Sequence, residues 1–166
     1  MSGRTSLLFV CLGNICRSPL AEGIFLHRAA ALGVADRFEV DSCGLGGWHS
    51  GEPPDGRAQA VARSRGVELG CVARKINPRD DFDRFGLILP MDPENRDRLL
   101  ALGAPAGRVR LVRSFDPLLR DTPEGELAVP DPYYGGPDGF EHVFEMLDRA
   151  CAGLLDSLLR EESWGR

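Results

Sequence analysis

The chain has 166 residues, which is the size of one ordinary domain and is enough to bury a substantial core. Its composition, 43% hydrophobic and 27% charged, is typical of a folded globular protein and excludes a disordered one. The formal net charge of −5 argues against a nucleic-acid-binding protein, whose surface would be basic. We therefore expect a single domain over residues 1–166 that binds no nucleic acid.

The apolar segments and the cysteines indicate the compartment. No apolar run is long enough to cross a bilayer, and the short apolar stretch near the N-terminus continues directly into a motif instead of a cleavage site. The five cysteines are an odd number without the spacing of a disulfide framework. We therefore expect a cytoplasmic protein with reduced thiols and no membrane partner.

The first half of the chain predicts two strands and two helices. Residues 7–10 are continuously apolar, as in a strand buried on both faces of a parallel sheet. Ser18 is expected to cap a helix that ends at Gly33. A second strand over residues 37–42 leads into an irregular glycine-rich loop, and a helix is expected over residues 55–65.

The second half predicts two more strands and two more helices. A buried strand is expected over residues 85–89, and Asp92 is interpreted as the cap of the helix that follows. A fourth strand is expected over residues 108–112. A long polar loop over residues 114–139 then leads to the last helix, whose apolar stripe runs over residues 140–158.

Strands that alternate with helices predict an α/β fold with a four-stranded parallel sheet and helices on both faces. In such sheets, ligands bind beyond the carboxyl ends of the strands. Cys11, the loop at Gly44 and Asp92 all follow strand ends. The sequence therefore predicts a pocket at this edge of the sheet.

The segment CLGNICRS, directly after the first strand, is suited to hold an oxyanion. Gly13 and Asn14 tolerate positive φ, so successive backbone N–H groups can converge on an anion, and the following helix adds its positive end. Arg17 supplies a planar fork that matches two phosphate oxygens. These groups would hold Cys11 as a nucleophilic thiolate, to which Ser18 could donate a hydrogen bond.

Two motifs at opposite ends of the chain, VCLGNICRSP and DPYYGG, resemble those of the low-molecular-weight protein tyrosine phosphatases. The stretches GLGGWHSGEPPDGRA and LVRSFDP also look like bacterial members, so the resemblance covers nearly the whole chain. It implies a cysteine-dependent hydrolase with a four-stranded parallel α/β fold and a phosphate-binding loop after the first strand. It also implies that the enzyme needs no metal or other cofactor.

The resemblance implies a mechanism in which Cys11 attacks phosphorus and forms a phosphocysteine. Arg17 would bind the phosphate oxygens, and Asp131 would protonate the leaving tyrosyl oxygen and then activate water. The residues expected to bind the phosphate or the phenyl ring are Leu12, Gly13, Asn14, Ile15, Cys16, Ser18, Trp48, Tyr133 and Tyr134. Ser42, together with Asn14, would support the loop from below by hydrogen bonds.

Two further cysteines matter to this interpretation. Cys16 can pack as a small buried hydrophobe, or it can form a reversible disulfide with Cys11 that protects the nucleophile from over-oxidation. The resemblance favours the redox role. The family often has a histidine near the position of Cys71, and this chain departs from the family there.

Three other activities compete with tyrosine phosphatase. An arsenate reductase needs further cysteines after the third strand, and PMDPENRDR has none. An arginine phosphatase would, by resemblance, carry a threonine in place of Ile15. A phosphocysteine carrier has no use for an acid at Asp131. We therefore expect a monomeric phosphatase that acts on phosphotyrosine proteins, among which a bacterial tyrosine kinase is a candidate partner.

Overall fold

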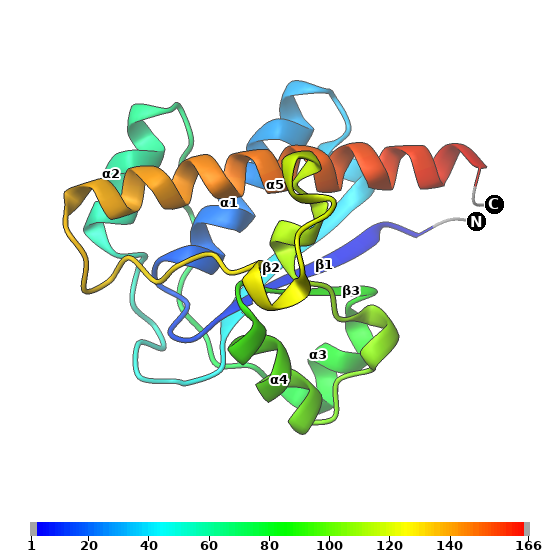
Figure 1. The fold of residues 1–166 in the computed structure, drawn as a ribbon, viewed down its shortest axis with the longest axis horizontal. Coiled ribbons are helices and arrows are strands. Elements are labelled where there is room, and N and C mark those ends of the chain that lie inside the picture. The colour runs from blue at the N-terminus through cyan, green and yellow to red at the C-terminus, as the bar shows by residue number, and fades with distance from the viewer. Residues whose placement is uncertain (1–2, 165–166) are drawn as a thin grey trace.

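The fold centres on a small parallel sheet (Figure 1). The computed structural model describes residues 3–164, so residues 1–2 and 165–166 of the expected domain lie outside the described part. Within that part, the sheet has three strands in the order β2-β1-β3, namely β1 (Thr5–Cys11), β2 (Phe38–Gly44) and β3 (Leu87–Pro90). Cys11 lies opposite Gly44, and Val10 lies opposite Pro90. All three strands therefore end at one edge, where the sequence predicts the pocket.

Helices cover both faces of this sheet. The described α-helices are α1 (Arg17–Ala31), α2 (Gly56–Ser64), α3 (Pro78–Arg84), α4 (Pro93–Ala101) and α5 (Pro137–Trp164). Figure 1 shows α1, α2 and α5 on one side of the sheet and α3 and α4 on the other. None of these helices is both long and apolar enough to span a membrane. The prediction of an α/β fold with a parallel sheet is confirmed.

The side chains of β1 alternate between two cores. Leu7 and Phe9 pack in the core that includes residues of α1 and α5, whereas Leu8 and Val10 pack with residues of α3 and α4. All four side chains are fully buried. This explains why the strand is continuously apolar in sequence, since both of its faces are covered.

The prediction of a fourth strand over residues 108–112 is wrong. In the described structure, this segment contributes one isolated parallel bridge, between Ile88 and Val109. Short 3-10 turns flank it at Ala106–Arg108 and Val112–Phe115. In a 3-10 turn, backbone N–H groups bond to carbonyl groups three residues earlier in the chain. Few N–H and C=O groups of this segment are therefore left to pair with β3.

Two of the expected helix starts also differ from the structure. Ser18 does not cap α1, which begins at Arg17, and the Ser18 side chain is instead fully buried inside the first turn. The last helix begins at Pro137, three residues earlier than expected. The cap at Asp92 is confirmed, since its carboxylate accepts the backbone N–H of Asn95 at 2.7 Å. Helix α3 was not predicted.

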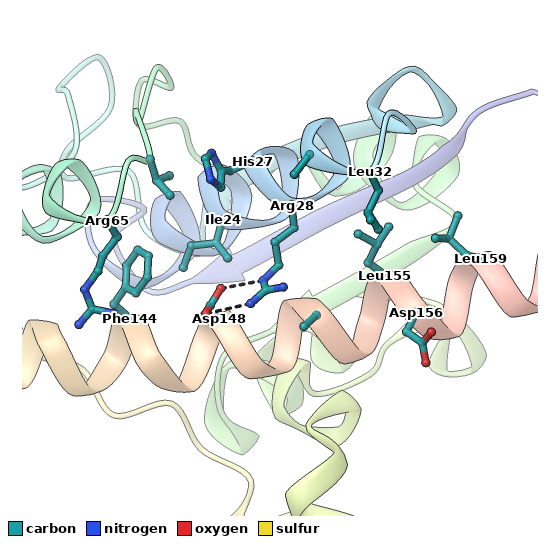
Figure 2. Close-up of a pocket in the computed structure, with 13 residues that line it drawn as sticks. Ile24, His27, Arg28, Leu32, Arg65, Phe144, Asp148, Leu155, Asp156 and Leu159 are labelled. Carbon is teal, nitrogen blue, oxygen red and sulfur yellow. Dashed lines mark hydrogen bonds and ion pairs between the residues drawn. The ribbon is translucent and has the colours of Figure 1, made fainter.

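Helices α1 and α5 pack side by side and are joined by a two-bonded ion pair. Arg28 on α1 donates to both carboxylate oxygens of Asp148 on α5, at 2.7 and 3.0 Å (Figure 2). Ile24 and Leu155 help to line a hollow of about 480 Å³ beside this pair. None of the expected site residues lines this hollow, so it is separate from the predicted pocket.

Gly153 on α5 generates a prediction about stability. A methyl group at this position would lie 1.9 Å from the backbone carbonyl oxygen of Phe115, which is closer than atoms can approach. We expect Gly153→Ala to lower the free energy of unfolding by about 1–3 kcal/mol, because the backbone must shift. Gly125→Ala is the control, since nothing lies within 4 Å of an added methyl there. Urea unfolding curves with equal midpoints for the two variants would contradict the expectation.

Candidate active site

The loop that joins β1 to α1 folds back over the sulfur of Cys11. Asn14 has the positive φ that its residue type allows, at 60°, and it is 2% exposed. Its backbone N–H donates to Cys11 Sγ at 3.3 Å. The loop therefore aims a backbone donor at the sulfur, as a charged sulfur requires.

Ser18 supplies the sulfur with a second partner. Its Oγ lies 3.0 Å from Cys11 Sγ and accepts a hydrogen bond from Asn14 Nδ2 at 2.8 Å. Because the hydroxyl has only one hydrogen, the bond from Asn14 leaves that hydrogen available for the sulfur. The carbonyl oxygen of Cys43 is a weaker alternative acceptor, at 3.5 Å.

The side chain of Asn14 is held from three directions beneath the loop. Nδ2 donates to Ser42 Oγ at 3.0 Å as well as to Ser18, and Oδ1 accepts the backbone N–H of Arg74 at 2.9 Å. Ser42 is 2% exposed. The structure thus brings Ser42 and Asn14 together under the loop, in the arrangement expected for supporting residues.

Arg17 is held as a buried cation at the end of the loop. It is 3% exposed, and its Nη1 donates to Asp92 Oδ2 at 2.7 Å and to the carbonyl oxygen of Val129 at 2.9 Å. Burial alone lowers the pKa of Arg17, but the charge of Cys11 and the hydrogen bond and charge of Asp92 raise it above its ordinary value. The interpretation of Asp92 as a helix cap was therefore correct but incomplete, because the same carboxylate also orients Arg17.

Asp131 reaches the same place from the far end of the chain. Its Oδ2 lies 3.8 Å from Arg17 Nη2, and its Oδ1 accepts the backbone N–H of Tyr133 at 3.1 Å. The side chain is 42% exposed, so its carboxylate remains in contact with solvent. The two motifs that the sequence singled out therefore meet in one site.

A pocket of about 320 Å³ opens over the loop. The residues that line it are Cys11, Leu12, Gly13, Ile15, Cys16, Arg17, Trp48, His49, Asp131, Tyr133 and Tyr134. Three expected residues, Asn14, Ser18 and Ser42, lie buried beneath the loop and do not line the pocket. The structure thus separates a layer that faces the pocket from a layer that holds the loop.

The aromatic wall of this pocket is largely exposed. Trp48 is 67% and Tyr134 is 92% exposed. Tyr133 is the best-held ring, with Tyr134 packed edge-on against it at 4.9 Å between centroids and the guanidinium of Arg57 at 5.4 Å from its centroid. The floor of the pocket is therefore fixed by burial, and its rim is made of loosely packed rings.

His49 is a pocket residue that the sequence did not reveal. A methyl group added at Gly13 would lie 3.2 Å from His49 Cδ2, so the ring packs closely on the loop. Its Nδ1 lies 3.1 Å from Glu52 Oε1. In sequence this histidine is isolated and has no partner at metal-ligand spacing, so no local pattern marks it as a site residue.

Cys16 is buried beside the nucleophile candidate and is 4% exposed. Burial first, and then the negative charges of Asp55 and Cys11, raise the pKa of its thiol to about 12. Cys16 and Cys11 are both free thiols. Among residues 3–164, no group of three or more histidine, cysteine or acidic side chains is arranged to hold a metal ion.

The chain resembles known proteins over nearly its whole length. Residues 6–163 match the family model described as "Low molecular weight phosphotyrosine protein phosphatase". A low molecular weight protein-tyrosine-phosphatase of Streptomyces coelicolor is 44% identical over 161 residues, which cover 95% of each chain.

Crystal structures of similar proteins have the same fold. YfkJ of Bacillus subtilis is 36% identical and superimposes with a TM-score of 0.86, covering 96% of this chain and 98% of its own. A protein tyrosine phosphatase of Entamoeba histolytica, crystallised with Hepes in the active site, is 34% identical with a TM-score of 0.85, covering 95% and 99% of the two chains. The family model covers most of the chain, the relatives share its fold, and both sequence motifs meet in one pocket. The chain therefore belongs to the low molecular weight protein-tyrosine-phosphatase family.

Proposed function

We propose that this protein is a protein tyrosine phosphatase in which Cys11 is the nucleophile, Arg17 binds the phosphate and Asp131 is the general acid and base. The observation that carries the proposal is the meeting of these three side chains in one pocket, although Asp131 is far from the other two in sequence. The named activity of the relatives supports the same conclusion.

The first chemical step forms a phosphocysteine. The sulfur of Cys11 attacks phosphorus as the bond from phosphorus to the tyrosyl oxygen breaks, and Asp131 gives its proton to that oxygen. Arg17 and the backbone N–H groups of the loop stabilise the charge on the other phosphate oxygens. The acid is needed because a phenol ionises only near a pKa of about 10, so an unprotonated tyrosyl oxygen leaves slowly.

The second step releases inorganic phosphate. Water attacks phosphorus, the bond from phosphorus to Cys11 breaks, and Asp131 takes the proton from the water. The sulfur leaves as a thiolate, to which the hydroxyl of Ser18 and the backbone N–H of Asn14 are placed to donate hydrogen bonds. The loop therefore serves both the attack and the departure of the same sulfur.

The pocket favours an aromatic ester as the substrate. Trp48, Tyr133 and Tyr134 stand at the rim, where they would contact a phenyl ring. Ile15, an aliphatic side chain of the lining, suits this ring better than the guanidinium of phosphoarginine. We also propose that the chain is one domain, acts in the cytoplasm as a monomer, and takes phosphotyrosine proteins such as a bacterial tyrosine kinase.

Replacement of the acid tests the chemistry. We expect Asp131→Ala to lower kcat on a phosphotyrosine peptide by about 10² to 10⁴-fold, because the leaving oxygen no longer receives a proton. A smaller loss is expected with p-nitrophenyl phosphate, whose leaving group is already acidic. The measurement is phosphate release from peptides that differ only in carrying phosphotyrosine, phosphoserine or phosphoarginine.

Two further variants serve as the inactive and the active control for this measurement. Cys11→Ser should show no turnover while still binding phosphate, and Asp138→Ala, which removes an exposed acid at the start of α5, should match the wild type. Unchanged turnover by Asp131→Ala, or a preference for phosphoserine or phosphoarginine, would refute the proposed function.

Asp92 tests how the arginine is oriented. Asn caps helices about as well as Asp, so Asp92→Asn keeps the start of α4 but removes the charge that faces Arg17. We expect both Asp92→Asn and Asp92→Ala to raise KM for an aryl phosphate by about tenfold, since a charge-assisted bond to Arg17 is lost or weakened. Only Asp92→Ala should also lose about 1 kcal/mol of stability. If KM rises only in Asp92→Ala, the variant that also loses stability, then Asp92 acts only as a helix cap.

The proposed redox role of Cys16 is also testable. Peroxide would oxidise Cys11 to a sulfenic acid, and attack by the sulfur of Cys16 would then release water and form the disulfide. Because its pKa is raised to about 12, Cys16 is a neutral thiol at pH 7, so the first oxidation falls on Cys11. After peroxide treatment, dithiothreitol should restore activity to the wild type but not to Cys16→Ser. Equal recovery, or the absence by mass spectrometry of a Cys11–Cys16 disulfide, would contradict this role.

A further inference from the structure

Glu22 lies behind the loop and is bound to its supporting residues. It is on α1, one turn beyond Ser18, and its Oε1 accepts the hydroxyl of Ser42 at 2.6 Å. Such a short distance is typical of a hydrogen bond to a charged acceptor. Glu22 does not line the active-site pocket, so any effect on the chemistry must pass through its neighbours.

Burial and two neighbouring side chains act on the carboxyl of Glu22. The thiol of Cys71 is also near Glu22 and favours the ionised form of its carboxyl. Burial raises the pKa of Glu22, and the hydrogen bond from Ser42 opposes this change by favouring the ionised form. A thiol is a weak donor, so Ser42 is the stronger of these two neighbours.

The hydrogen bonds that run from Glu22 toward the loop have a fixed direction. Ser42 Oγ donates to Glu22 Oε1, so the single hydrogen of Ser42 points to Glu22. The oxygen of Ser42 is then free to accept from Asn14 Nδ2, at 3.0 Å. On its other side, Asn14 Oδ1 accepts the N–H of Arg74, so both ends of the network favour the same orientation of this amide.

This orientation decides where the hydrogen of Ser18 goes. With its NH₂ group facing the two serines, Asn14 donates to Ser18 Oγ at 2.8 Å, and Ser18 is left to donate to Cys11 Sγ at 3.0 Å. We propose that Glu22 is a positioning residue which, through Ser42 and Asn14, keeps the Ser18 hydroxyl directed at the nucleophilic sulfur. The proposal rests on the proposed function, in which Cys11 is the nucleophile.

A glutamine at this position removes the charge that fixes the direction without changing the shape. Its amide oxygen can still accept from Ser42, but its NH₂ group can instead donate to Ser42 Oγ, and the hydrogen of Ser42 would then turn toward Asn14. To accept it, the Asn14 amide would have to reverse, which places its NH₂ group against the N–H of Arg74. The reversed amide would also draw the Ser18 hydrogen toward its own oxygen and away from Cys11.

A double-mutant cycle of Glu22→Gln and Ser42→Ala tests the proposal. We expect each single variant to lower kcat for an aryl phosphate about tenfold, the effect of losing one hydrogen bond to a charged sulfur. If Glu22 acts through Ser42, the double variant should be no slower than the slower single variant. KM should change by less than about twofold, because the phosphate ligands are untouched.

Alkylation of Cys11 by iodoacetate provides a readout that does not depend on phosphatase activity. At pH 6 its rate should fall in Glu22→Gln, since the sulfur loses a hydrogen-bond donor that stabilises its ionised form. Glu68→Gln is the matched control, because Glu68 is exposed and paired with Arg63. Circular dichroism checks folding, and if Glu22→Gln does not fold, Glu22→Asp replaces it in the cycle, since this change withdraws the carboxyl from Ser42.

The outcomes separate this proposal from the proposed function. A kcat loss in the double variant equal to the product of the two single losses, or an alkylation rate unchanged in both Glu22→Gln and Glu22→Asp, would overturn the positioning role. A wild type that hydrolyses no aryl phosphate would overturn the proposed function instead. In that case the alkylation rates would still decide whether Glu22 acts on Cys11.

Discussion

The ion pair between Arg17 and Asp92 is the interaction on which the site depends. Each partner stands at the start of a helix, and each follows one of two adjacent strands. A guanidinium that is 3% exposed is stable only where its charge is matched, so the pair ties α1 to α4 across the edge of the sheet. The loop that begins at Cys11 therefore has both of its ends fixed, one by β1 and the other by this pair.

Local charge in the site differs from the charge of the whole chain. The chain carries a net charge of −5, yet the floor of the pocket presents a buried arginine and a backbone donor aimed at the sulfur. A phosphate dianion would meet this floor and not the average surface. The carboxylate of Asp131 stands at the solvent-exposed side, 3.8 Å from Arg17 Nη2, where it is close to the oxygen that the proposed mechanism protonates.

The sequence predicted correctly those elements that are determined by residues close together in the chain. The apolar run of β1, the cap at Asp92 and the loop rich in glycine and asparagine follow from propensities of nearby residues, and the structure has all of them. The strand at residues 108–112 failed because two 3-10 turns, invisible in a short apolar run, compete for its backbone. His49, Arg74 and Glu22 were missed because their roles depend on contacts between segments that are distant in sequence, and no local pattern carries that information.

The pocket joins a buried floor to a rim of exposed rings, and this division has an evolutionary consequence. Trp48 and Tyr134 contribute little to the buried core, so changing them costs the fold almost nothing. Asn14, Ser18 and Ser42 are fully enclosed, and altering them disturbs a network in which every polar atom has a partner. Descendants of this chain could therefore acquire new peptide preferences by substitutions at the mouth while inheriting the same reaction unchanged.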